Sequence, residues 1–274
     1  MIKRLKTFFS QLEALVIKHL RLNARYKVKF LMTIIVPFTS LLVPFLIFSK
    51  LFDAIGEESF GIWTPTNFVI FILTGVSIVI ILSFISDFGK NLLREKYWKT
   101  LHGIFMSPIN IYTFLLSKLI SDLIIYIIPL TIIFIFCFLI TGASIITILA
   151  MVVFYLMACI FVASIGLAIG SFRMSVEGDY NTAIISIKFF LIFSCYKYPR
   201  EFYPAFLDFL IIYNPFYYFF DLIRVVLVLG FENVVFNPRY LNHFLIVILS
   251  TIAAPILSVL LFTYIYKKYG ITGY

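Results

Sequence analysis

Long uninterrupted apolar runs constrain this chain more than any other feature of its sequence. An α-helix rises about 1.5 Å per residue, so about 20 apolar residues cross the roughly 30 Å hydrocarbon core of a bilayer. The chain is 62% hydrophobic and only 13% charged, whereas about a quarter of the residues of a soluble domain are charged. Lipid must therefore replace water over much of its surface. The candidate spans are residues 30–48, 68–86, 119–140, 146–169, 181–195 and 244–266.

These runs predict an all-α polytopic membrane protein with six transmembrane helices. No stretch is polar enough for a separate soluble domain, so we expect residues 1–274 to form a single transmembrane domain. Residues 30–195 would hold spans one to five, the fifth of them short, and residues 244–266 the last span. The apolar stretch 202–229 is interrupted by Pro, Asn and charged residues. It suits a re-entrant or interfacial hairpin shielded by protein, within an outer segment of residues 196–243.

The positions of the basic residues predict the orientation of the chain. Sixteen of the 22 Lys and Arg residues lie in the segments 1–29, 87–118, 170–180 and 267–274. Because basic residues are enriched on the cytoplasmic side, we expect both termini in the cytoplasm of a multi-pass protein of the inner or plasma membrane. The net charge of +9 then reflects topology and contact with anionic lipid, and nucleic acid is not an expected partner.

The N-terminal segment, residues 1–29, has the pattern of an amphipathic helix. Its apolar residues recur at helical spacing, with basic residues between them. The apolar residues are Ile2, Leu5, Phe9, Leu12 and Val16, and the basic ones are Lys3, Arg4 and Lys6. The pattern predicts a helix that lies in the membrane interface. A cytoplasmic helix packed on another subunit is the alternative.

Catalytic and metal-binding patterns are missing from the sequence. The three cysteines, Cys137, Cys159 and Cys195, lie far apart, and so do the three histidines. Residues 56–61 have the glycine spacing of a phosphate loop, but residues 62–63 are Ile-Trp where Lys and Ser or Thr are required. We therefore expect no enzymatic activity, no bound cofactor and no metal site in this chain.

The segment between the second and third spans, residues 87–118, is an unusual connector that contains the sequence EKYWKTLHGIFMSPIN. Residues 94–106 fit a short amphipathic helix, because Leu101, Ile104 and Phe105 recur at helical spacing. The Ser-Pro pair that follows favours the start of a new helix. A short cytoplasmic helix of this kind suits docking into a groove on a soluble partner. An interfacial helix that rests on lipid is the alternative.

This connector resembles the cytoplasmic loop of type-2 ABC exporter permeases, whose pattern is roughly Glu-Arg-Glu-x-Gly-Thr-Leu-Glu-x-Leu-Leu-x-Ser/Thr-Pro. The residues that match in place or conservatively are Glu95, Lys96, Thr100, Leu101, Ile104, Phe105, Ser107 and Pro108. In that family the loop carries a coupling helix that contacts the ATPase subunit. The resemblance implies that the ATPase-coupling residues here are Glu95, Lys96, Trp98, Thr100, Leu101, Ile104, Phe105 and Pro108.

A second segment, residues 194–230, resembles the same family independently. The family has Ser-Gly-x-x-x-Pro before its last span, then a Pro five residues on, then Asn-Pro and an Arg before a closing Gly. The residues that fall on those positions are Ser194, Pro199, Pro204, Asn214, Pro215, Arg224 and Gly230. Two matches in the right order, surrounded by six predicted spans, are more specific than either match alone.

The outer segment also carries candidate functional residues. Asn214 and Pro215 should separate two short helices, because Pro lacks an N–H and pushes the preceding residue away from helical angles. Asp221 and Arg224 are three residues apart on one helical face and can pair, either as a structural strut or as a charge pair at the outer exit of a substrate path. Lys188 lies inside a predicted span, where it is either functional or snorkels to the interface.

The resemblance implies the membrane subunit of an ATP-driven exporter. Two such membrane subunits, here a homodimer, would work with two ATPase subunits that bind the ATP and Mg²⁺. Substrate would leave the cytoplasm by alternating access, and the Phe-rich spans would suit an amphipathic or lipid-like substrate. A secondary transporter or channel without an ATPase, and a membrane-anchored assembly or immunity factor, are the alternatives.

Overall fold

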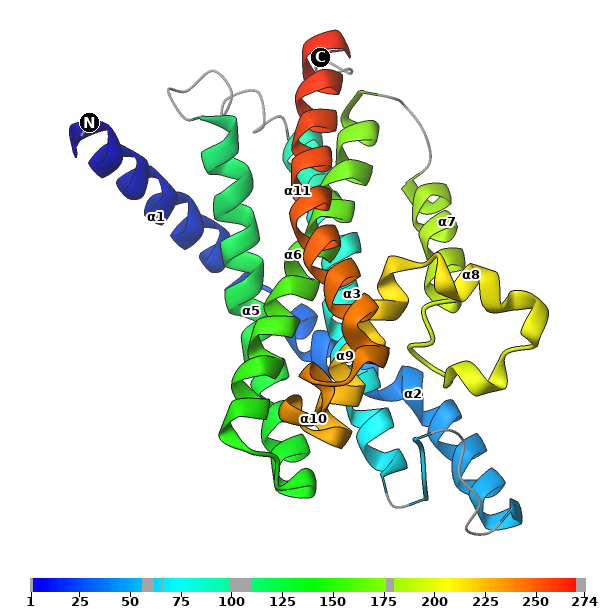
Figure 1. Ribbon diagram of the computed structural model, residues 1–274. Helices are drawn as coiled ribbons and strands as arrows, with labels where there is room; N and C mark the ends of the chain where they lie inside the picture. Colours follow the sequence, from blue (N-terminus) through cyan, green and yellow to red (C-terminus); the bar gives the residue numbers. More distant parts are fainter. Residues whose placement is uncertain (1, 56–61, 66, 99–109, 176–179, 270–274) are drawn as a thin grey trace.

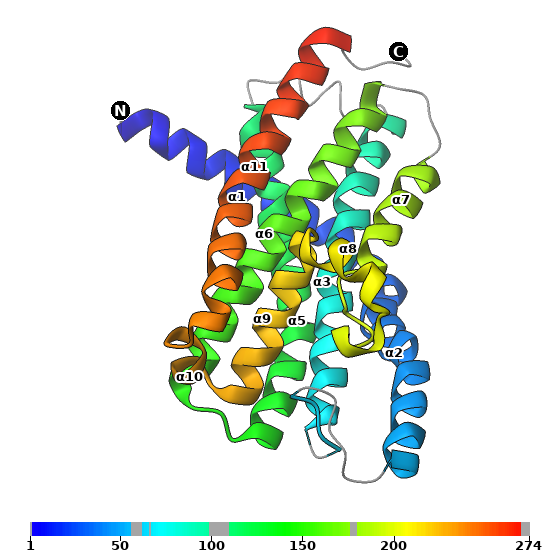
Figure 2. The same cartoon turned by 45° about the vertical axis from the view of Figure 1, so that its right-hand side comes forward.

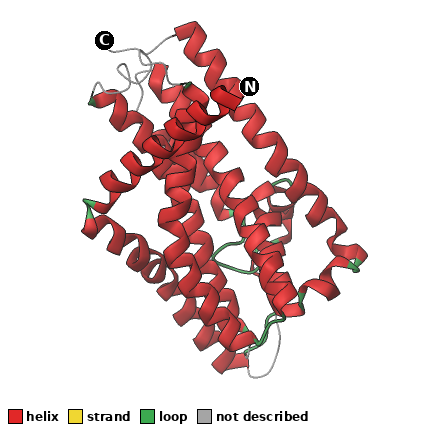
Figure 3. Cartoon of the chain, turned by 90° about the vertical axis from the view of Figure 1, so that its left-hand side faces the viewer, coloured by secondary structure: helices red, strands yellow, loops and turns green. Residues whose placement is uncertain are grey.

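The computed structural model describes residues 2–55, 62–65, 67–98, 110–175 and 180–269, which form helices and connecting loops with no strand among them (Figure 3). The α-helices are α1 (Ile2–Ala24), α2 (Lys27–Ile55), α3 (Phe68–Tyr97), α5 (Ile111–Thr141), α6 (Ile145–Ser175), α7 (Tyr180–Ile192), α8 (Asp208–Ile212), α9 (Pro215–Leu229), α10 (Phe231–Val235) and α11 (Leu241–Tyr269). Three short 3-10 helices accompany them, η1 (Arg200–Phe202), η2 (Ala205–Leu207) and η3 (Pro238–Tyr240). The predicted all-α fold class is confirmed.

The helices form a bundle around α6, which packs against both α3 and α11 (Figure 1). α5 and α2 also pack against α3. α9 contacts α6, α11 and α3 and is buried along most of its length, as its aromatic-rich sequence favours. Phe219 of α9 stacks on Phe161 of α6 with ring centroids 4.7 Å apart. The first turns of α1 and the last turns of α11 lie at the same end of the bundle, opposite α10 (Figures 1 and 2).

The structure confirms four of the predicted spans. The helices long and apolar enough to cross a membrane are Ile35–Asp53, Tyr112–Thr141, Ile145–Phe172 and Pro238–Lys268. They correspond to the predicted first, third, fourth and sixth spans. Gly142 ends α5 in the left-handed conformation, with φ of 59°, and the chain turns into α6 over residues 142–144.

The count of six spans is not confirmed. The apolar part of α3 found among the described residues, Phe68–Ser83, is shorter than a full span. The predicted fifth span, 181–195, corresponds to α7, which ends at Ile192 after 13 residues. A helix of that length extends only about 20 Å. The described residues therefore provide four spans, or up to five if the bent pair formed by Ala205–Ile212 and Pro215–Leu229 is counted as one.

That bent pair lies in the predicted outer segment 196–243, and it breaks where the sequence predicts. Its two arms meet at an angle of 93°. Asn214 caps α9 by accepting a hydrogen bond from the backbone N–H of Phe216 at 3.1 Å, and Pro215 occupies the first turn of α9. The Asn214 amide also donates to the carbonyl of Phe190 at 2.7 Å, which ties the break to α7. Both a re-entrant hairpin and a span broken at this point have such a bend.

The N-terminal helix is present as predicted and packs within its own chain. α1 contacts α5, and the ring of His19 lies 5.8 Å from the ring of Phe114. Leu15 and His19 are buried, whereas Phe9 and Ile17 are exposed. α1 leaves the bundle at an angle (Figures 1 and 2), and its exposed apolar residues are free to meet lipid, which keeps the predicted interfacial position open.

Gly75 marks a close approach of α3 to its neighbours. A Cβ atom at this position would lie 3.1 Å from Cδ1 of Leu41 in α2 and 3.4 Å from the carbonyl oxygen of Tyr196. The leucine side chain can shift, but the carbonyl belongs to the backbone of the segment after α7. Glycine therefore lets α3 pack against both segments at once.

Replacement of Gly75 by leucine should destabilise the bundle by about 1–3 kcal/mol, because the added side chain overfills a close backbone contact. The measurement is the thermal unfolding midpoint of the purified protein in detergent. Thr131→Leu is the control, since it enlarges an exposed residue on α5. Equal midpoints for the two variants would contradict the close packing at Gly75.

Candidate functional site

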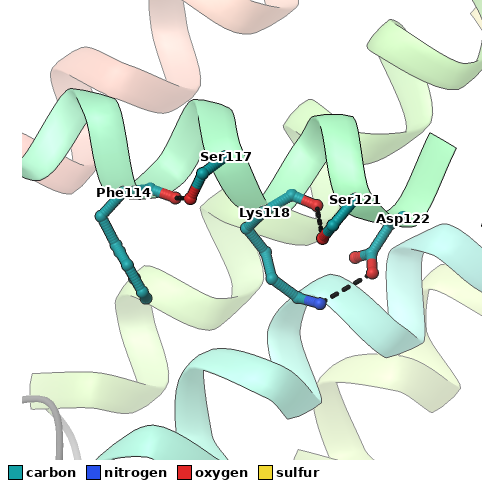
Figure 4. Close-up of polar contacts among 5 residues, drawn as sticks. All are labelled: Phe114, Ser117, Lys118, Ser121 and Asp122. Carbon is teal, nitrogen blue, oxygen red and sulfur yellow. Dashed lines mark hydrogen bonds and ion pairs between the residues drawn. The ribbon is translucent and has the colours of Figure 1, made fainter. Parts of the chain in front are cut away.

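A buried ion pair lies in α5 near the end of the bundle that holds the first turns of α1. Nζ of Lys118 donates to Oδ1 of Asp122 at 2.7 Å, and the two side chains are 2% and 4% exposed (Figure 4). The hydroxyls of Ser117 and Ser121 donate to carbonyls of α5 itself. A buried pair of charges persists only when both partners are present. The i,i+4 spacing could have revealed this pair, but the predicted boundary between residues 118 and 119 placed Lys118 in the loop and Asp122 in the span.

Glu95 connects α3 to the N-terminal helix. It sits in the last turn of α3 and is 3% exposed. Its Oε1 lies 3.4 Å from Nζ of Lys18 in α1. The contact joins residues 77 positions apart in the chain, so no local pattern could have predicted it. The last turn of α3, which leads into the predicted coupling helix, is therefore held against α1.

The other predicted coupling residues are only partly described. Lys96 belongs to the last turn of α3, and Trp98 follows it with 49% of its surface exposed. The remaining ones, Thr100, Leu101, Ile104, Phe105 and Pro108, lie outside the described residues. The contact of this segment with an ATPase stays a prediction.

Arg224 in α9 is buried and binds the backbone of the segment that follows α7. Its two Nη atoms donate to the carbonyls of Cys195 at 2.6 Å and Tyr196 at 2.5 Å. Its guanidinium also lies over the ring of Phe71 in α3, 3.7 Å from the centroid. Cys195 has a positive φ of 56°, so its carbonyl lies outside helical hydrogen bonding and needs a donor from elsewhere.

The predicted pair between Asp221 and Arg224 is wrong. Oδ2 of Asp221 lies 3.1 Å from Nε2 of His243 in α11, whereas Arg224 donates to the two carbonyls. Spacing of three residues places both side chains on one face of α9 but does not decide what each one meets. The turn after α7 offers the guanidinium closer acceptors than the carboxylate does.

Lys188 lies on the exposed surface of α7. The neighbouring residues Ile185, Phe189 and Phe190 are also exposed, at 62%, 55% and 59%. This face of α7 is therefore open to lipid or to another subunit within the described part of the chain. The two alternatives for Lys188, a functional charge and a side chain that snorkels to the interface, both stay hypotheses.

A cavity of about 300 Å³, here called the hairpin cavity, opens between the segment after α7, α9 and the start of α11. The turn at residues 62–63 and Phe71 of α3 complete its wall. Aromatic rings and ionisable side chains line it together. The ionisable residues are Arg200, Glu201, Asp221, Arg224, Arg239 and His243.

The imidazole of His243 is the centre of an aromatic cluster in this cavity. Its ring lies 4.9 Å from that of Tyr218, 5.6 Å from that of Tyr240 and 5.9 Å from that of Tyr217. Together with Asp221, these rings join the first turn of α11 to α9. Residue spacing gave no signal for this cluster, because η3 and α11 approach α9 only in the folded chain.

Replacement of Asp122 by asparagine should lower the unfolding free energy by about 3–5 kcal/mol, because Lys118 stays buried without this carboxylate. The control is Asp53→Asn, which removes an exposed partner of Lys50 and should cost less than about 1 kcal/mol. Thermal unfolding in detergent measures both changes. The double change of Lys118 to methionine and Asp122 to leucine should recover stability. If Asp122→Asn alone costs as little as Asp53→Asn, the pair is solvated.

Replacement of Arg224 by leucine should cost about 3 kcal/mol or more, because two buried carbonyls lose their charged donor. Arg224→Lys should restore little, since one ammonium cannot reproduce the planar fork. Asp221→Asn should be tolerated far better. The readout is the fraction of protein that elutes as a single species in gel filtration. Recovery of the fold by the charge swap, Asp221→Arg with Arg224→Asp, would mean that the two residues support each other after all.

Comparison with known proteins agrees with this architecture. The family described as "ABC-2 family transporter protein" matches the chain over residues 67–266. The match begins just before α3 and ends within α11, so it includes the loop after α3, the bent pair and all of the hairpin cavity except the turn at residues 62–63. No curated protein matches the chain. The matched region is well over half of the 274 residues, and it confirms the predicted resemblance: the chain is a membrane-embedded permease that belongs to the ABC-2 family of transporter proteins.

Proposed function

We propose that this chain is the membrane-spanning subunit of an ATP-driven exporter. In this proposal a separate ABC ATPase binds and hydrolyses ATP with Mg²⁺, and two copies of the chain form the path through the inner or plasma membrane. Membership of the ABC-2 family supports a transport role and an ATPase partner in general. The basic N-terminal segment and the two lysines at the end of α11 support cytoplasmic termini.

The observation that carries the mechanism is the continuity of α3. It runs for 30 residues without an internal proline, a length of about 45 Å. Its last turn holds Glu95, next to the predicted coupling helix. Its first turns hold Phe71, whose ring lies against the Arg224 guanidinium, and Gly75, where an added Cβ would lie 3.6 Å from Arg224. A push on residues 95–107 would therefore reach the hairpin cavity through one rigid element.

Two ion pairs near residues 95–107 would transmit this push to the neighbouring helices. Lys18 holds Glu95 against α1, and the pair of Lys118 and Asp122 stiffens the first half of α5. When the ATPases close, α1, α3 and the start of α5 would move together as a rigid body. Tilting of α3 against α9 would then open the outer side of the path. This sequence of steps is alternating access.

The substrate proposed is amphipathic or lipid-like. The spans are rich in phenylalanine, and the exposed apolar face of α7 would offer an apolar wall to a path between two subunits. The same face supports a homodimer, since a second copy would cover side chains that otherwise meet lipid. A secondary transporter, a channel or an assembly factor would need no ATPase.

Purification of the tagged full-length chain from native membranes distinguishes these functions. An exporter subunit should copurify with an ABC ATPase, and reconstitution of the pair should raise ATP hydrolysis over that of the ATPase alone. Copurification with no ATPase, together with transport driven by an ion gradient, would support a secondary transporter instead.

Replacement of Leu101 and Phe105 together by aspartate should abolish ATPase binding, because a desolvated charge in an apolar groove costs about 2–5 kcal/mol. The matched control is Val235→Asp with Phe236→Asp, two exposed residues at the opposite end of the bundle. Both double variants should insert and elute as single species, and only the first should lose the ATPase in copurification. If the first variant still stimulates ATP hydrolysis, the coupling contact lies elsewhere.

A further inference from the structure

The charged groups of the hairpin cavity fall into two classes, those already engaged and those still open. Arg224 is engaged by the carbonyls of Cys195 and Tyr196. Arg200 is engaged by Asp208, since its Nε donates to one carboxylate oxygen at 2.8 Å and its Nη2 pairs with the other at 2.5 Å. These two arginines shape the cavity but have little capacity left for a ligand.

Asp221 is only partly engaged. Its side chain is 26% exposed, and its Oδ2 pairs with Nε2 of His243 at 3.1 Å. That contact falls short of hydrogen-bonding geometry, and no described residue donates a hydrogen bond to Oδ1. A largely buried carboxylate normally accepts hydrogen bonds from charged donors. Asp221 therefore has an oxygen left for a cationic donor within the cavity, and Glu201 lines the same space with a second carboxylate.

The guanidinium of Arg239 has hydrogen-bond donors that no described acceptor uses. It lies in η3 at the exposed side of the cavity, with its guanidinium 6.0 Å from the ring of Tyr240. No described carboxylate or carbonyl accepts a hydrogen bond from it. A guanidinium held on an aromatic face keeps its planar edge of N–H donors for a carboxylate or a phosphate.

The uncharged wall between these groups is aromatic. The rings of Trp63, Tyr217 and Tyr240 line the cavity and are 4%, 6% and 5% exposed. Electron-rich ring faces attract an ammonium group, and their apolar surface excludes water around it. The cavity therefore combines an acceptor for a cation, a donor set for an anion and an aromatic surface between.

We propose that the hairpin cavity binds a small zwitterionic headgroup, with its ammonium on Asp221 and Glu201 and its phosphate or carboxylate on Arg239. An anion alone would leave Oδ1 of Asp221 without a donor and would face two carboxylates. A cation alone would leave Arg239 without an acceptor. The volume of about 300 Å³ lies at the small end of ligand cavities, which suits a headgroup better than a larger molecule.

The site lies within one subunit, and its occupation requires no ATPase, second subunit or transport step. It can therefore exist whether or not the proposed export function is correct. The zwitterion could come from the headgroup of a membrane lipid or from a free small molecule, since both present the same two charges to the cavity.

The test measures binding of glycerophosphoethanolamine to the full-length chain in nanodiscs of phosphatidylglycerol, by saturation-transfer NMR without ATP. Glycerol 3-phosphate, which carries only negative charge, and ethanolamine, which carries only positive charge, are the comparison probes. The zwitterion should bind about tenfold more tightly than either, because each open group forms a charge-assisted hydrogen bond only with it. Binding of glycerol 3-phosphate as tight as that of the zwitterion would overturn the proposal.

Variants assign the two charges of the site. Asp221→Asn and Arg239→Gln should each weaken binding of the zwitterion by about tenfold, while Asp53→Asn, far along the chain in α2, should leave it unchanged. Arg239 is exposed on η3, so its variant tests the site even if Asp221→Asn fails to fold. Unchanged affinity in Arg239→Gln would overturn the proposal.

Nanodiscs of phosphatidylethanolamine distinguish the two sources of the ligand. If lipid headgroups occupy the cavity, these nanodiscs should block binding of the soluble probe. In the Arg239→Gln variant, probe binding should then be the same in both lipids. If the probe binds equally in both lipids, the site takes a free zwitterion.

Discussion

A backbone that leaves helical geometry inside a membrane bundle must find donors for its carbonyl groups, because lipid supplies none. α7 ends at Ile192 after 13 residues, and the turn that follows contains the carbonyls of Cys195 and Tyr196. Arg224 supplies the donors for both. The same guanidinium lies over Phe71 in α3, beside Gly75. One buried arginine thus fixes the end of α7, the position of α9 and the packing of α3.

The two polar ends of the bundle are linked through α3. At one end, Glu95 contacts Lys18 of α1, close to the loop predicted to meet an ATPase. At the other, Phe71 lines the hairpin cavity beneath Arg224. Between them the faces of α3 that meet α6 and α5 are packed with apolar side chains, including Ile78 and Ile81. Force applied at one end of such an element is not absorbed by an internal hinge.

Local patterns in the sequence predicted what local physics determines. The apolar runs gave four spans, and Asn214 with Pro215 gave the break before α9, because helix length and capping depend on neighbours in the chain. Patterns of this kind could not show that Arg224 meets carbonyls 28 and 29 residues away, or that Glu95 meets Lys18. The short fifth span was overestimated because residues 193–195 are apolar enough for a helix, whereas the structure turns there.

The contacts of Arg224 also bear on the order in which the protein is synthesised. Every partner of this arginine precedes it in the chain: Phe71, then Cys195 and Tyr196. Synthesis from the N-terminus therefore completes every one of these acceptors before the arginine that needs them. The buried charge of α9 is thus added to a chain that already contains the groups that satisfy it.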